Sequence, residues 1–205
     1  MGITERRERQ RKEVRDSILQ SAWQIVNEEG RQTLSIRKIA DAIEYSIPVV
    51  YDHFENKEAI LFEFTKLGFQ KLSDRLKETI AKYQSPAEQL EAIGYAYWDF
   101  AFENKEYYQV MFGLGMPGCE QIKKMPELMD FTEIIKTTIE HVAEINGNKE
   151  INSFLKLNSF WSTLHGLVSI NLMAAPAEQH EGADRGDFNK MILNDFIKGF
   201  LKGLA

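Results

Sequence analysis

Hydrophobic side chains recur along the chain at the three- and four-residue spacing of amphipathic helices. Over residues 11–29 they fall on one helical face, at Val14, Ile18, Ala22, Ile25 and Val26. Gly30 follows at the position where a helix C-cap belongs. No stretch alternates with period two over a useful length, so the pattern predicts an all-α fold of about nine helices with essentially no sheet.

Two short helices follow the first. Residues 35–43 carry apolar side chains at i, i+3, i+4 and i+7, and residues 47–54 start after Ser46, a residue type that caps helices. Pro48 is tolerated there because the first turn of a helix has no intrahelical partner for its N–H groups. Asn56 is placed to cap a long helix that we expect to end near Tyr83.

Further along the chain, Pro86 opens the first of five more predicted helices, at 86–103, 105–113, 126–145, 149–175 and 187–204. We expect residues 1–10 to form a flexible basic arm, residues 11–56 an N-terminal three-helix domain, and residues 57–205 a larger helical domain. Two short helices joined by a three-residue turn and braced by a preceding helix describe a helix-turn-helix motif, here residues 35–54.

Composition limits the kinds of site the chain can build. Its 205 residues contain one cysteine, Cys119, which excludes an internal disulfide and a cysteine-rich metal centre. No pair of histidines has metal-ligand spacing, and no nucleophile–base pair or phosphate-binding glycine loop is present. We therefore expect no enzyme, no cofactor and no metal. The N-terminus is charged and no apolar run could span a bilayer, which favours a cytoplasmic protein without a membrane partner.

The net charge of −6 conceals a split between the two ends of the chain. Residues 1–38 contain nine Lys or Arg and six acids, for a charge of +3, which leaves −9 on the remaining 167 residues. A basic end on an acidic body is compatible with a nucleic-acid contact confined to that end. A solvated first helix of mixed charge would give the same split.

The residues of the two short helices carry more information than their pattern. Ile39-Ala40, Ser46, Tyr51-x-His53-Phe54 and Lys57-Glu58-x-x-Leu61 occur in order and without gaps. In this, residues 11–70 resemble the TetR family of bacterial transcriptional repressors. Phe160-Trp161-Ser-Thr-Leu-His165-Gly166 is similar, more weakly, to the Trp-x-x-x-His-Gly signature of the WHG type of TetR C-terminal domain.

The resemblance implies contacts with duplex DNA. It assigns base or phosphate contacts to Ser35, Arg37, Lys38, Ile47, Pro48, Val49, Tyr51, His53 and Lys57. Three positions depart from the family pattern: Glu44 replaces a glycine of the turn, Ile47 a polar residue, and Val49 a small hydroxyl residue. Ile47 could read thymine methyl groups or could be buried, Phe54 fits the core, and His53 could be an ordinary surface histidine.

The C-terminal body is rich in aromatic and methionine side chains. Most of these side chains should pack in the core, but aromatic and methionine side chains also suit the walls of an apolar ligand cavity. We expect this cavity to be lined by Tyr95, Trp98, Phe102, Tyr107, Met111, Phe112, Phe131, Trp161 and His165. His165 could orient a ligand or bond a backbone carbonyl, and Asp99 could hold a cation or face solvent. Wide apolar stripes on the last two helices predict a dimer interface that includes Leu167, Phe188, Ile192, Phe196 and Phe200.

Together these features favour a homodimeric, ligand-responsive DNA-binding regulator. As the resemblance implies, a small apolar or amphipathic effector would release it from a palindromic operator, and it would act as a repressor. The alternative is an all-helical module that binds small molecules or proteins and whose helical hairpin is merely structural.

Overall fold

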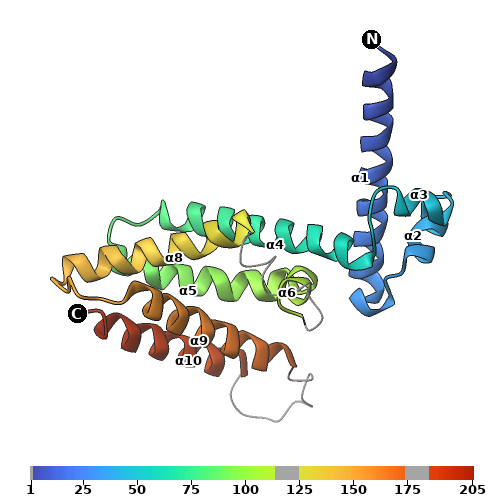
Figure 1. Ribbon diagram of the computed structural model, residues 1–205. Coiled ribbons are helices and arrows are strands. Elements are labelled where there is room, and N and C mark those ends of the chain that lie inside the picture. Colours follow the sequence, from blue (N-terminus) through green and yellow to red (C-terminus); the bar gives the residue numbers. More distant parts are fainter. Residues whose placement is uncertain (1, 114–124, 174–184) are drawn as a thin grey trace. The chain divides into compact units, whose positions relative to one another are not determined.

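The computed structural model describes residues 2–113, 125–173 and 185–205. In this part of the chain it contains nine α-helices, one short 3₁₀ turn and no strand. The helices are α1 (Ile3–Glu29), α2 (Ile36–Ala42), α3 (Ile47–Tyr51), α4 (Lys57–Ile80), α5 (Pro86–Glu103), α6 (Lys105–Phe112), α8 (Pro126–Ile145), α9 (Ser153–Met173) and α10 (Arg185–Lys202), shown in Figure 1. The all-α prediction is confirmed, while Cys119 lies outside the described residues.

Helix α1 begins at Ile3, so the prediction of a flexible arm over residues 1–10 is wrong for residues 3–10. The backbone N–H of Gly2 donates to the Glu5 carboxylate at 2.8 Å, which satisfies one of the free N–H groups at the helix start. The spacing of Glu5 to Arg9 and of Glu8 to Lys12 also places opposite charges four residues apart, an arrangement that stabilises helices.

Helices α2 and α3 are each shorter than their apolar patterns predict. At the start of α2 the hydroxyl of Ser35 accepts a hydrogen bond from the Lys38 N–H at 3.2 Å. Ser46 takes the N-cap position of α3, but its side chain makes no capping bond. Asn56 caps α4 as predicted, because its Oδ1 accepts from the Ala59 N–H at 2.8 Å.

The chain packs as two compact units whose division falls within α4. Unit 1 comprises residues up to Gly68 together with α6, and unit 2 comprises Phe69–Lys105 together with α8, α9 and α10. This division differs from the predicted boundary after residue 56. Ile60 and Phe64 of α4, and Val110 of α6, are buried in the core of unit 1, so packing extends that unit beyond the helix-turn-helix.

Each unit has its own core. In unit 1, Ile18, Ala22 and Val26 of α1 are buried together with Ile39 of α2 and Val50 of α3. In unit 2, α5, α8, α9 and α10 pack side by side, as Figure 1 shows, and bury aromatic rings among their aliphatic side chains. None of the described helices combines the length and the apolar character that crossing a membrane would require.

Candidate functional site

The turn between α2 and α3 holds one residue in an unfavourable backbone conformation. Glu44 has a φ of 57°, in the left-handed region that a residue with a Cβ avoids at a cost of roughly 1–2 kcal/mol. The neighbouring N–H of Tyr45 donates to the Ala40 carbonyl at 3.0 Å, which closes the turn. The turn therefore keeps its left-handed geometry although this chain lacks glycine there.

Helix α3 presents one face to solvent and the other to the core. Val50 is fully buried and Phe54 nearly so, whereas Ile47 is 40% exposed and Tyr51 53% exposed. Pro48 is also exposed and Val49 is half-buried. Ile47 is therefore not buried in the core but lies on the solvent-exposed face of α3. Its contact with a DNA groove stays a prediction.

The two basic residues of α2 differ in how closely each is paired with an acid of the same chain. The Arg37 side chain is 82% exposed and lies 3.9 Å from Asp41 of its own helix, a separation at which the pair adds little stability. The Lys38 ammonium lies 2.6 Å from the Glu29 carboxylate at the end of α1. Arg37 is thus available to an external anion, whereas Lys38 would have to exchange its partner.

His53 lies just after α3 in a positive environment. Burial lowers the pKa of His53, and the charges of Arg11 and Arg15 lower it further against the opposing effect of Asp52. Ser35 is half-buried and uses its hydroxyl as the cap of α2, and Lys57 is half-buried at the start of α4. Eight of the nine predicted DNA-contact residues thus lie on α2, on α3, or within two residues of their ends, and the ninth, Lys57, begins α4.

Two arginines of α1 were predicted only as general charge, and the structure gives them specific partners. Arg11 donates to the carbonyl of Asp52 at 3.4 Å, and the Arg15 guanidinium lies 4.6 Å from the centre of the Phe54 ring. Arg15 also pairs with Glu63 at 3.3 Å. The four-residue spacing of Arg7, Arg11 and Arg15 was the signal in the sequence.

The nine residues predicted to line a ligand cavity divide between the two units. Tyr107, Met111 and Phe112 belong to unit 1, where Tyr107 stacks on Trp23 with ring centres 3.9 Å apart. The other six belong to unit 2, at Tyr95, Trp98, Phe102, Phe131, Trp161 and His165. There the Phe131 and Trp161 rings meet edge to face at 5.3 Å and those of Trp98 and Phe102 lie 4.8 Å apart.

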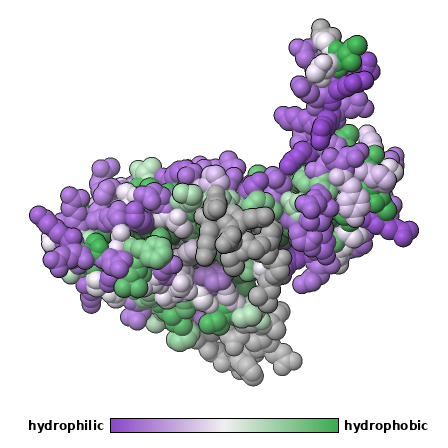
Figure 2. Space-filling model, viewed as in Figure 1, coloured by the Kyte–Doolittle hydropathy of each residue, from purple (hydrophilic) through white to green (hydrophobic). Residues whose placement is uncertain are grey.

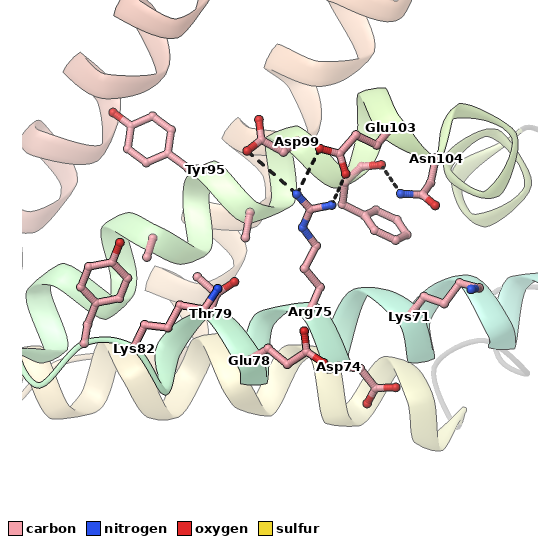
Figure 3. A pocket seen from close by; sticks show the side chains of 14 residues that line it. Lys71, Asp74, Arg75, Glu78, Thr79, Lys82, Tyr95, Asp99, Glu103 and Asn104 are labelled. Carbon is pink, nitrogen blue, oxygen red and sulfur yellow. Dashed lines mark hydrogen bonds and ion pairs between the residues drawn. The ribbon is translucent and has the colours of Figure 1, made fainter.

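A hollow of about 680 Å³ lies between the second half of α4 and α5 in unit 2, and Figure 3 shows its lining. Of the predicted cavity residues, Tyr95 alone is among its lining residues. Arg75 reaches from α4 to two acids of α5, with Glu103 at 2.5 Å and Asp99 at 4.0 Å. The Asp99 side chain is 48% exposed beside Arg75, so it faces solvent in part, and its role toward a cation stays a prediction.

His165 of α9 is half-buried, and burial lowers its pKa, which favours the neutral ring. Its Nε2 lies 3.3 Å from the Ser169 hydroxyl, one turn along the same helix. This side-chain contact does not decide whether His165 also bonds a backbone carbonyl. Its role toward a ligand stays a prediction.

The residues predicted for a dimer interface behave in two ways. Phe196 and Phe200 of α10 pack against Phe160 of the same chain, with ring centres 5.8 Å and 5.0 Å away. Phe188 and Ile192 are exposed and Leu167 is half-buried. Large apolar side chains that the sequence analysis left out of this set are also exposed on α9 and α10, at Ile170, Met173 and Met191.

Two segments of the chain match known families. Residues 18–64 match the model of bacterial regulatory proteins of the tetR family, and residues 90–194 match the tetracyclin repressor-like C-terminal domain. The first match covers α2, α3 and the exposed face described above. The WHG type of C-terminal domain stays a prediction.

Similar proteins agree with these matches. YobS, an HTH-type transcriptional regulator of Bacillus subtilis (strain 168), is 28% identical over 92 residues, which are 45% of this chain and about half (48%) of that protein. The TetR family regulator PfmR from Thermus thermophilus is 20% identical with a TM-score of 0.62, covering 92% of this chain and 98% of that chain.

A third similar protein was solved with a ligand. The regulator FadR from Bacillus subtilis, crystallised with stearoyl-CoA, is 18% identical with a TM-score of 0.64, covering 92% of this chain and 96% of that chain. At such identities the structures show a shared fold. Because the C-terminal family match alone spans half of the sequence, the chain belongs to the TetR family of bacterial regulatory proteins, which are helix-turn-helix transcriptional regulators.

Proposed function

We propose that the protein is a homodimeric repressor that binds a palindromic operator and leaves it when a small molecule binds. The observation that carries the proposal is the face of α2 and α3, where Arg37, Ile47 and Tyr51 are exposed above a buried core of Val50 and Phe54. A short helix held rigidly from behind is what the major groove admits, because only a few side chains need to reach the base edges.

The exposed face of α2 and α3, which we call the reading surface, is apolar at Ile47, Pro48 and Val49. Their side chains offer no hydrogen bonds, so they would recognise thymine methyl groups and the shape of the duplex. Arg37 would supply the hydrogen bonds to a base edge or a phosphate. Tyr51 and His53 would donate to backbone phosphates, Ser35 and Lys57 would contact further phosphates, and Lys38 would add positive charge.

A second copy of the chain would supply the second reading surface. Two recognition helices on one face of a duplex must sit about 34–36 Å apart, which a symmetric dimer provides. Exposed apolar side chains on α9 and α10, among them Ile170, Phe188 and Ile192, support this pairing, because isolated monomers rarely leave such patches uncovered.

The effector would be an apolar or amphipathic molecule taken up by the aromatic body. Support comes from the aromatic side chains of unit 2 and from the stearoyl-CoA bound by the related FadR. Helix α4 contributes residues to both units, so a shift of α4 would be felt at Lys57. A coupling of about 1–3 kcal/mol would change operator affinity by roughly 5- to 150-fold.

Footprinting on the DNA upstream of the protein's own gene tests this proposal. We expect protection of a two-fold symmetric site, bound by a dimer in size-exclusion light scattering, and weaker binding when stearoyl-CoA or other acyl-CoA esters are added. An absence of protected sequence would contradict the regulator. Protection that no acyl-CoA weakens would leave the repressor and reject this class of effector.

A further inference from the structure

The exposed N-terminal half of α1 separates its charges between two faces. With about 100° of rotation per residue, the four acids Glu5, Glu8, Glu13 and Asp16 fall within an arc of about 140°. The remaining arc of about 220° carries no acid, and its charged residues are Arg6, Arg7, Arg11 and Arg15. We call this arc the arginine face of α1.

The middle of the arginine face, at Arg7 and Arg11, lies on the same side of α1 as the recognition helix, and Arg6 lies at its edge. Arg7, Gln10, Arg11 and Val14 of α1 line a hollow of about 520 Å³ together with Tyr45, Val49, Asp52 and His53. The Arg11 guanidinium donates across this hollow to the carbonyl of Asp52. The face is therefore continuous with the surface of α3 that carries Val49 and His53.

The charges of this face are not all used within the protein. Arg15 pairs with Glu63 and covers the Phe54 ring, and Arg11 contacts α3, so both help to fix α1 against the domain. Within the described part of the chain, Arg6 and Arg7 have neither an ion pair nor a side-chain hydrogen bond, and both are exposed. In Figure 2 this end of α1 is mainly hydrophilic below a hydrophobic patch near its tip.

We infer that the arginine face of α1 is a second DNA-contact surface, which binds the sugar-phosphate backbone beside the bases that α3 reads. This inference rests on the proposed function, and its occupant is the phosphate backbone of duplex DNA. The eleven residues from Ile3 to Glu13 span about 16 Å at 1.5 Å per residue, which is about five base pairs of duplex.

A rigid helix makes this contact differently from a flexible arm. The arginines are already ordered, so little chain entropy is lost when they meet the phosphates. Phosphate contacts carry no sequence information, so the arginine face would raise affinity for every duplex by the same factor. The choice of operator would stay with α3.

Two matched double substitutions test the inference. Arg6→Gln/Arg7→Gln removes two positive charges from the arginine face, and Arg9→Gln/Lys12→Gln removes two from the acid-bearing face of the same helix. Gln has nearly the helix propensity of Arg and Lys, so α1 should remain intact in both, as circular dichroism would verify. Arg6→Lys/Arg7→Lys keeps the charge and serves as the rescue variant.

The readout is the salt dependence of binding to a fragment of the protein's own promoter and to an unrelated duplex of equal length. Because each neutralised phosphate contributes a slope of about 0.9 in log K against log salt, we expect Arg6→Gln/Arg7→Gln to lower the slope by about two per protomer. Both duplexes should weaken by the same factor. The Arg9→Gln/Lys12→Gln and Lys variants should keep the wild-type slope.

Equal effects of the two Gln doubles would overturn the inference, because only the overall charge would then matter. An unchanged slope in Arg6→Gln/Arg7→Gln would overturn it as well and would leave the proposed function in place. A wild-type protein that binds neither duplex would contradict the proposed function itself, and the inference with it.

Discussion

Helix α3 of unit 1 and the aromatic core of unit 2 use large apolar side chains in opposite ways. In unit 1, α3 exposes Ile47 and Tyr51 to solvent and keeps only Val50 for the core. In unit 2, α5 and α8 bury Tyr97, Trp98 and Phe131 among other rings and aliphatic side chains. The exposed side chains of α3 are open to an external partner, whereas a buried ring already has its partners within the chain.

This difference shows which sequence signals identify a site. The ordered motif around α3 includes Ile47 and Tyr51, which the structure leaves exposed, and their contact with DNA stays a prediction. The aromatic richness of the body has a structural purpose, because its rings pack against one another. Composition alone therefore does not separate a ligand wall from a core.

The substitution with the largest expected effect is Phe131→Ala. Phe131 is fully buried and its ring lies within about 6 Å of the Phe69, Tyr97 and Trp161 rings. Removing it should lower the free energy of unfolding by about 3–5 kcal/mol, measured by urea denaturation. Met129→Ala, at an exposed position of α8, is the control and should change it by less than about 0.5 kcal/mol.

If Phe131→Ala lost little stability but its operator binding no longer weakened when acyl-CoA was added, the contrast between α3 and the aromatic core of unit 2 would be wrong. The ring would then be a wall of a ligand site, as the sequence analysis proposed, and its packing in this structure would not describe its main role.

His53 should make operator binding depend on pH. Burial and Arg11 lower its pKa in the free protein, and nearby DNA phosphates would raise it, so binding takes up protons. Affinity should therefore rise as the pH falls from 8 to 6, by at most about tenfold per pH unit per protomer. Isothermal titration in buffers of different ionisation heat would measure the uptake.

His53→Gln removes the titrating ring and is the matched test. Its operator affinity should vary less with pH than that of the wild type. Equal pH dependence in the two proteins would show that His53 does not contact the phosphates. His165 is not expected to cause this pH dependence, because it lies in unit 2 and the predicted DNA-contact residues lie in unit 1.

Glu44→Gly should stabilise unit 1. Glycine adopts a φ of 57° without the steric cost that Glu44 bears, although it also gives the unfolded chain more freedom. The free energy of unfolding should rise by about 1 kcal/mol, and a higher midpoint in urea with an unchanged slope would report it. A lower midpoint would indicate that the Glu44 side chain contributes an interaction worth more than the strain.

The ion pairs of Arg75 should have the smallest effect on stability. Hydrogen bonding to Arg75 lowers the pKa of Glu103, so the stabilisation is present above the unfolded pKa of Glu103 and is lost as the pH falls through the folded value. Because the Glu103 side chain is 61% exposed, solvent screens the pair, and Arg75→Ala should cost at most about 1 kcal/mol at neutral pH. A larger loss, measured by urea denaturation, would mean that Arg75 supports the hollow between α4 and α5.

The sequence was sufficient for most helix boundaries, because proline at the start of α5 and α8 and asparagine before α4 mark them locally. It placed the start of α1 too late, because charged residues without an apolar stripe look like a flexible arm. The sequence also assigned α6 to the larger helical domain, whereas α6 packs in unit 1. Only packing shows that Tyr107 stacks on Trp23 and that Val110 joins the core of unit 1.

The central claim is that the exposed face of α2 and α3 binds operator DNA, and one titration tests it most directly. The affinity of the promoter fragment would be measured for Arg37→Ala/Tyr51→Ala and for Lys82→Ala/Tyr83→Ala, a basic and aromatic pair exposed beyond the end of α4. Loss of two contacts worth about 1–3 kcal/mol each predicts at least about a 30-fold weaker complex for the first variant, with helicity and dimer mass unchanged. The second variant should bind like the wild type. Wild-type affinity in Arg37→Ala/Tyr51→Ala would contradict the account.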